Sequence, residues 1–579
     1  MNNYNIDQMT LSISLDYKPK ENHPARFIND LVESLNINEV YSSGRPREYD
    51  LRAMLKLILF AYSRSVVTSR KIEEFAEENI VARWLTQYQV PSYRTICRFR
   101  ISKEIESLLN DSLTNLTNVL KQNGLIDEVS FIDGTKILAD ANKFSFVWKK
   151  NTIRFEEMNK AQIQNLLSEI NEVRKGIVEN PSDLSDDALE EVQTKLELYL
   201  EDLNEKIEEN PKVSPNPDKQ ERRKLKSCSR KLDERINKKS EHEKQMDTFE
   251  KRNSYSKSDK DATFMRIKED PMLNGQLKPA YNVQIATNNQ FITGVGLFQN
   301  PTDTRTLVPF IKQLEENGTL GDMIVADAGY GSESNYQYLE DNYKKYIIPY
   351  STMLKENTKK WKSDEKKVMN WNYYEDEDFY MNPQNVRFNF NAYRIRTDKY
   401  GFKRYFKEYI AEIFDDNHNR IPQAFTPGGN RKRILINPSL EYFKASMRDK
   451  LSNSQGADIY ARRKIDVESV FGNMKACLGF NRFHVRGLDK VKKEIMIVVM
   501  ALNIRKLVSM SFYFSLWTTK KASMNFFKIH IEAFLVKRLF CHSPFLISEI
   551  NKFVFIFKRY SNAYLSFYSL IFQKLFCFH

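Results

Sequence analysis

The stretch VSFIDGTKILAD, residues 129–140, places a carboxylate inside a run that otherwise predicts a buried strand. Apolar residues lead from Val129 into Asp133 and resume after Gly134, up to Leu138. A charge at that depth is costly unless it is paired or binds a metal ion. Asp133 is therefore a candidate functional residue.

The chain is basic and has few cysteines. Among its 579 residues, 89 Lys and Arg stand against 76 Asp and Glu, a formal net charge of +13. Such an excess suits a polyanionic partner, nucleic acid before an anionic membrane surface, although heavy lysine usage in an AT-rich genome is the alternative explanation. Five scattered cysteines argue against a disulfide framework and against a cysteine-based zinc site.

The sequence shows no membrane-targeting feature. Its first residues lack the basic start and the apolar core of a signal peptide. No segment reaches the roughly 18 uncharged residues that a membrane-spanning helix needs. We expect a cytoplasmic protein without a membrane partner.

Periodicity and composition divide the chain into helical and strand-rich segments. Apolar residues recur at helical spacing near the N-terminus and, coiled-coil-like, in a long charged stretch after residue 152, whereas strand signals return at 277. The predicted segments are an N-terminal helical domain (1–125), a first part of the core (126–152), a helical insertion (153–260), a second part of the core (261–350), a second, β-containing insertion (351–455), a C-terminal part of the core (456–510) and an unassigned Phe-, Tyr- and Lys-rich tail (511–579).

Basic side chains gather on a predicted N-terminal helix in PSYRTICRFR, which has Pro91 and Ser92 as start signals. Its face with Arg94, Arg98 and Arg100 is suited to lie along a phosphate backbone. A helical bundle with a solvated basic face is the alternative.

Two further carboxylates share the context of Asp133. Asp327 ends an apolar strand in MIVADAGYG, where two glycines let backbone approach a ligand closely. Glu468 lies on a predicted helix, in one stripe with Tyr460 and Lys475. Converging carboxylates suit Mg²⁺, which prefers a few of them plus water and phosphate oxygens, and paired ions catalyse phosphodiester chemistry. A lone aspartate at a strand end, however, is more often a turn or cap residue.

The blocks FIDGTK, ADAGYGS and YARRKIDVESVFGNMKACLGF resemble the three motifs of a DDE transposase. The closest resemblance is to bacterial insertion-sequence transposases of the IS1182 family, related to the IS4 group, and it extends over most of residues 40–507. It implies an α/β fold: a ribonuclease-H-like mixed sheet core with an N-terminal helical domain, a helical insertion after Asp133 and a second, β-containing insertion before Glu468.

The resemblance also implies the site residues. Asp133, Asp327 and Glu468 are the expected catalytic triad and the ligands of Mg²⁺, with Mn²⁺ as a substitute. The family signature of Tyr, Arg, Glu and Lys falls on Tyr460, Arg463, Glu468 and Lys475, although the Arg-to-Glu interval is one residue longer than usual. The expected DNA contacts are Lys475, Arg463, Tyr460, Arg94, Arg98, Arg482 and Arg486.

Several nearby residues have two interpretations. Asp140 and Asp303 are acids that support the site or serve the fold. The aromatic side chains of KFSFVWKK, residues 143–150, either stack on extruded DNA bases or pack beside a core strand. Lys475 either contacts a phosphate or is an ordinary surface lysine.

The resemblance implies a transposase that binds the terminal inverted repeats of its element. It would hydrolyse a phosphodiester at each end and join the freed 3′-hydroxyl to target DNA. Because two ends are processed together, a homodimer or a higher assembly on DNA is expected. Two alternatives stay open: a decayed or domesticated protein that only binds DNA, and a metal-dependent nuclease without strand transfer.

Overall fold

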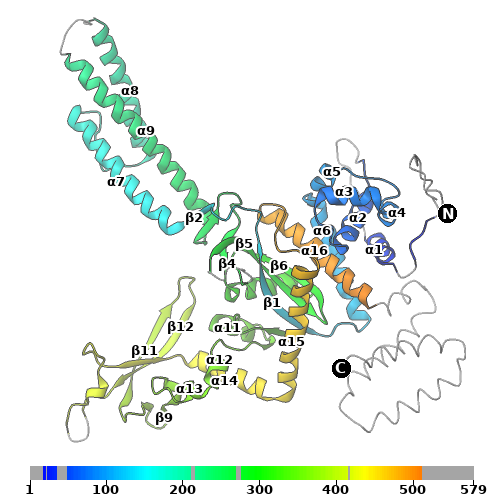
Figure 1. Ribbon diagram of the computed structural model, residues 1–579. Helices are drawn as coiled ribbons and strands as arrows, with labels where there is room; N and C mark the ends of the chain where they lie inside the picture. Colours follow the sequence, from blue (N-terminus) through cyan, green and yellow to red (C-terminus); the bar gives the residue numbers. More distant parts are fainter. Residues whose placement is uncertain are drawn as a thin grey trace, which may run out of the picture. The chain divides into compact units, whose positions relative to one another are not determined.

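A computed structural model describes residues 17–20, 23–35, 48–209, 216–268, 275–414 and 418–510 (Figure 1). The predicted tail, 511–579, lies outside the described residues. The chain divides into two compact units, Met1–Lys18 with Phe27–Lys506, and Pro19–Arg26 with Leu507–His579. The side-chain contacts described below lie within the first unit. Within the part of the chain that the structure describes, no helix is long and apolar enough to cross a membrane.

The N-terminal region is helical, as predicted. Several of its helices begin at side-chain caps: Asp50 accepts the backbone N–H groups of Arg52 and Ala53, and Ser92 accepts that of Thr95. The start predicted at Ser92 is therefore confirmed. The helices are α1 (Pro24–Glu33), α2 (Leu51–Ser63), α3 (Ser69–Glu78), α4 (Ile80–Leu85), α5 (Tyr93–Arg100) and α6 (Lys103–Gln122).

The core is a mixed sheet in which β1 is central. β1 pairs antiparallel with β5 and parallel with β7, and the strand order is β4-β5-β1-β7-β8, with β6 also paired to β5. This arrangement is consistent with the predicted ribonuclease-H-like core. The strands are β1 (Val129–Leu138), β4 (Thr263–Arg266), β5 (Leu277–Asn288), β6 (Phe291–Phe298), β7 (Met323–Ala326) and β8 (Lys345–Ile347).

Helices pack on this sheet through one apolar cluster that includes Ile132, Phe310, Tyr336 and Phe443, all of them buried. Such burial is the main favourable term in folding. The elements of this part of the chain are the 3₁₀ turn η1 (Asp303–Arg305), α10 (Leu307–Glu316), α11 (Glu333–Asp341), α14 (Pro438–Ser452), α15 (Ser454–Gly472), the π turn η4 (Asn473–Cys477) and α16 (Leu488–Ser509).

The first insertion is a set of three long helices that lie side by side (Figure 1). Leu167, Leu196 and Leu225, one from each helix, belong to a common buried cluster, as the coiled-coil-like spacing predicts. Two short antiparallel strands, β2 and β3, pair where the insertion leaves and rejoins the core. The elements are β2 (Phe146–Trp148), α7 (Lys149–Val173), α8 (Asp186–Glu209), α9 (Pro217–Phe249) and β3 (Ser254–Ser256).

The second insertion contains strands, as predicted. They form a five-stranded antiparallel sheet of order β13-β12-β11-β10-β9, with Val386, Phe388 and Tyr409 in its core. The elements are α12 (Met353–Glu356), α13 (Lys359–Lys362), η2 (Val368–Asn370), β9 (Asn372–Tyr374), β10 (Phe379–Met381), β11 (Arg387–Thr397), β12 (Lys403–Ala411), η3 (Pro422–Ala424) and β13 (Arg433–Ile436).

A buried ion pair joins the N-terminal helices to the core. The Arg100 guanidinium lies 2.5 Å from the Glu494 carboxylate of α16, and the side chains are only 5% and 2% exposed. Arg100 also donates to the Tyr62 hydroxyl and to Ser69 Oγ. The expectation that Arg100 lies on an exposed basic face is therefore wrong, because its side chain is buried and forms an ion pair with a buried carboxylate.

Replacing Glu494 by Gln tests this ion pair. The variant leaves the Arg100 charge buried without its counter-charge, so we expect about 3–5 kcal/mol less free energy of unfolding, measured by urea denaturation. Asp202→Asn is the matched control, since it breaks an exposed pair with Lys206 on α8 and should change stability by less than about 0.5 kcal/mol. Equal losses for the two variants would contradict the structural role of the pair.

Candidate active site

The register of two parallel strands brings Asp133 and Asp327 together. Ile132 of β1 pairs with Ala326 of β7, and each aspartate is the next residue along the chain. Neighbouring strands lie about 4.8 Å apart, so the carboxylates start from adjacent backbone positions. Both side chains are partly buried. The structure thus joins two of the three predicted triad residues.

The Asp133 carboxylate has two partners. Its Oδ1 accepts the Gly134 backbone N–H at 2.7 Å, and its Oδ2 accepts Arg463 Nη1 at 3.1 Å. Gly134 leaves no room for a side chain, because a Cβ there would lie 2.2 Å from Gln284 Nε2 and 2.8 Å from Asp303 Oδ1. The close approach of these groups explains the glycine next to Asp133.

The Asp327 carboxylate is held by the loop that follows β7. Its Oδ1 accepts the Gly329 backbone N–H at 2.8 Å, and a Cβ on Gly329 would lie 2.9 Å from that oxygen. The loop is tied to η1, since Thr304 Oγ1 donates to the Gly329 carbonyl at 2.9 Å. The glycine-rich loop therefore fixes a carboxylate, and the close approach of its backbone to a ligand stays a prediction.

A third acid, Asp303 of η1, is held near the pair by a polar network. Its Oδ1 accepts Asn282 Nδ2 at 2.8 Å and Gln284 Nε2 at 3.0 Å. The Tyr330 hydroxyl donates to Gln284 Oε1. Asn282, Gln284 and Tyr330 are fully buried. Sequence reasoning noted Asp303 only as a nearby acid, because the amides that hold it are distant in sequence and carry no motif.

The carboxyl of Asp133 has a raised pKa. Burial raises the pKa of its carboxyl to about 6, and the negative charges of Asp327 and Asp303 raise it too, against the Gly134 N–H and the Arg463 guanidinium, which lower it. The pKa of the buried Tyr330 hydroxyl is likewise raised, by burial and by the same three acids. Asp133 and Asp327 thus form a pair of carboxylates with one counter-ion, Arg463, and their remaining negative charge favours a cation.

Helix α15 docks beside the acids through three polar contacts. The Gln290 backbone N–H donates to the buried Asp466 carboxylate at 2.7 Å, and Arg462 pairs with Asp127 at 2.7 Å. Arg463 reaches Asp133, and its guanidinium lies 5.6 Å from the Tyr460 ring centre. Two of the predicted signature residues, Tyr460 and Arg463, therefore lie at the aspartates.

The third triad residue, Glu468, is exposed. It stands five residues after Arg463, about 140° around the helix. Within the described residues, no group of three acidic, histidine or cysteine side chains is close enough together to hold a metal ion. The structure therefore does not bring Glu468 into one group with Asp133 and Asp327.

Lys475 lies in the π turn η4, which follows the last α-helical residue, Gly472. A π turn contains more residues than an α turn, so the stripe predicted through Tyr460, Glu468 and Lys475 does not continue regularly past Gly472. The prediction assumed one uninterrupted helix, because no feature of the sequence indicates the π turn.

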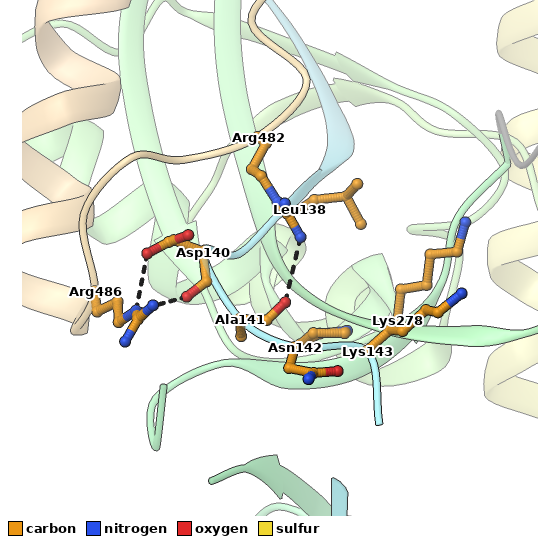
Figure 2. A pocket seen from close by; sticks show the side chains of 9 residues that line it. Leu138, Asp140, Ala141, Asn142, Lys143, Lys278, Arg482 and Arg486 are labelled. Carbon is orange, nitrogen blue, oxygen red and sulfur yellow. Dashed lines mark hydrogen bonds and ion pairs between the residues drawn. The ribbon is translucent and has the colours of Figure 1, made fainter. Parts of the chain in front are cut away.

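Arg482 and Arg486 line a pocket of about 630 Å³ at the end of β1 (Figure 2). The segment before α16 bridges to β1, because Phe483 N donates to the Leu138 carbonyl at 2.9 Å. Arg482 donates to backbone carbonyls, whereas Arg486 Nε contacts the Asp140 carboxylate at 2.8 Å. The lining residues are Leu138, Asp140, Ala141, Asn142, Lys143, Lys278, Pro279, Arg482 and Arg486.

The remaining candidates lie elsewhere. Arg94 and Arg98 are exposed on α5. Phe146 and Trp148 pack near Phe264, with ring centres 6.0 and 5.9 Å away, which favours the packing interpretation of these two aromatic residues.

Comparisons with known proteins identify two domains. Residues 252–504 match the family model described as "Transposase DDE domain", and residues 13–102 match the one described as "Transposase domain (DUF772)". Together the two matches span more than half of the chain. A comparison with curated proteins gave no match.

The raised pKa of Asp133 predicts a pH dependence of stability. Because its folded-state pKa of about 6 exceeds the ordinary 3.8, ionising it disfavours the folded state, and this penalty develops as pH rises from about 4 to 6. In EDTA, Asp133→Asn should remove that fall in stability, worth about 2–3 kcal/mol. Urea denaturation at pH 4 and 7.5 measures it, with Asp322→Asn, at the other end of β7, as control. A variant with the wild-type pH dependence would contradict the assignment.

Proposed function

The chain belongs to the DDE transposases of insertion sequences, with the domain combination typical of the IS1182 family, and from this membership we propose its reaction. It binds the terminal inverted repeats of its element, hydrolyses a phosphodiester at each end and transfers the freed 3′-hydroxyl to target DNA. The observation that carries the proposal is the pair of carboxylates, Asp133 and Asp327, at adjacent positions of parallel strands.

These carboxylates fit a divalent metal ion. They are hard oxygen ligands from neighbouring strands. The pKa of Asp133 is raised by burial and then by the negative charges of Asp327 and Asp303, and a cation would neutralise that charge. Asp133 and Asp327 would hold Mg²⁺, with Mn²⁺ as a substitute and Glu468 as the third ligand. A bound metal supplies an activated water and stabilises the leaving oxygen. Arg463 provides the positive charge beside Asp133 in this structure.

The protein's own residues position the DNA. Tyr460, Arg463 and Lys475 are proposed to contact the strand that is cut, since the first two lie at the aspartates. Arg482 and Arg486 are proposed to bind a phosphate in the pocket at the end of β1, the strand that carries Asp133. The exposed Arg94 and Arg98 of α5 are also proposed to contact DNA phosphates.

A protein that only binds DNA is the second candidate. One observation favours it: Glu468 is exposed, and the structure does not bring it into one group with Asp133 and Asp327. A nuclease without strand transfer uses the same acids and differs only in its products. The proposed transposase acts as a homodimer or a higher assembly, because both ends of the element must be cut together.

A plasmid carrying the element ends separates the three activities. With Mg²⁺, the wild-type protein should release cut ends and yield joined products. Nicked DNA without joined products indicates a nuclease, and binding without Mg²⁺-dependent cleavage indicates a binding protein.

Asp133→Ala and Asp327→Ala should each lower cleavage by about a thousandfold or more, because each removes a proposed metal ligand, while binding of the end duplex persists. Glu468→Ala tests the third ligand in the same assay. The control is Asp322→Ala, an exposed aspartate directly before β7, which should cleave like the wild type. Full cleavage by Asp133→Ala would show that the triad assignment is wrong.

A further inference from the structure

The hairpin of β11 and β12 carries an unusual exposed surface. Tyr393, Ile395 and Tyr405 are 72%, 61% and 55% exposed. Ile395 pairs directly with Tyr405, and Thr397 with Lys403, so these side chains share one face of the two-stranded ribbon. Large apolar side chains gathered on an exposed face mark an interaction site more often than an ordinary surface.

The ribbon is strongly basic. Residues 387–411 contain seven Lys and Arg against two acids. Both acids are already neutralised: Glu408 pairs with Arg394 at 2.9 Å, and Asp398 with Arg305 at 3.1 Å. Arg396, Lys399 and Lys403 have no carboxylate partner among the described residues, so their charges are available to a polyanion.

The tip of the ribbon is held at η1, the turn that carries Asp303. The Arg305 guanidinium lies 3.6 Å from the ring centre of Tyr400 and binds Asp398. Arg305 belongs to the same 3₁₀ turn as Asp303, whose charge acts on Asp133. Arg404 adds a second tie, 3.3 Å from Glu333 of α11. A ligand on the ribbon would therefore be held close to the reacting carboxylates.

We propose that the β11–β12 ribbon binds duplex DNA next to the point of cleavage, an inference that rests on the proposed function. Arg396, Lys399 and Lys403 contact phosphates, and Tyr393 and Tyr405 contact sugars and base edges. A two-stranded ribbon fits the major groove of B-DNA, and the positive charge of this one favours DNA over an apolar protein partner. The ribbon is a DNA-contact element additional to the pocket of Arg482 and Arg486.

The test is fluorescence anisotropy with a labelled duplex of the inverted repeat read from the DNA that flanks the gene. The double variant Arg396→Glu/Lys403→Glu should weaken binding about tenfold or more and flatten the dependence of log K on log salt by about 2, near 0.9 for each phosphate that is no longer bound. The matched control is Lys359→Glu/Lys360→Glu on α13, which makes the same charge change on exposed residues of the same insertion and should keep the wild-type slope.

A variant that changes no charge, Tyr393→Ser/Tyr405→Ser, tests whether the two tyrosine side chains contact the DNA. It should weaken binding about tenfold with an unchanged salt slope, since every ionic interaction with the phosphates is kept. Thermal melting checks that the substitutions, all of exposed side chains, leave the fold intact. If this variant instead changes only sedimentation behaviour, the face is a self-association surface and the proposal is wrong.

The wild-type protein and the ribbon variants together separate the ribbon from the proposed function. A wild-type protein that neither binds nor cuts the end duplex overturns the proposed function and the ribbon with it. A wild-type protein that binds and cuts, beside ribbon variants with unchanged affinity and salt slope, overturns the ribbon alone.

Discussion

The parallel pairing of β1 with β7 is the constraint on which the site depends. A shift of one residue would move Asp133 and Asp327 to opposite faces of the sheet, because side chains alternate along a strand. The register is secured on both sides of β1: Ile132 pairs with Ala326 and also with Ala286 of β5. The core sheet therefore sets the separation of the two carboxylates, and loops only refine it.

The sequence was sufficient to predict the elements that have local signals. The apolar run around Asp133, the loop with Gly329 and the cap at Ser92 each contain residue types with clear local structural preferences. The helices of the first insertion were also predicted, since their apolar periodicity is strong, whereas for the irregular second insertion only the presence of strands was predicted. Asp133 and Asp327 could be recognised as a pair because each ends an apolar run before a glycine or a tight loop.

What the sequence could not predict depends on contacts between distant segments. The network of Asp303 needs Gln284 and Tyr330, which meet only in the folded sheet. The burial of Arg100 follows from Glu494, almost four hundred residues away, so an arginine on a basic helix face was misread as exposed. The π turn after Gly472 likewise has no pattern of its own, and it displaced Lys475 from the predicted stripe.

The arginines around the acids are held in ion pairs of the protein itself. Arg463 binds Asp133, and Arg305 binds Asp398 at the tip of the ribbon. Under the proposed function, Arg463 would be able to exchange Asp133 for a DNA phosphate, since a metal ion held by Asp133 would neutralise that carboxylate. An exchange of partners avoids leaving a partly buried charge unpaired at any stage, which is the costly alternative. The carboxylates Asp133 and Asp327 and the guanidinium of Arg463 thus place negative and positive charge side by side, which suits the joint binding of a cation and a phosphate.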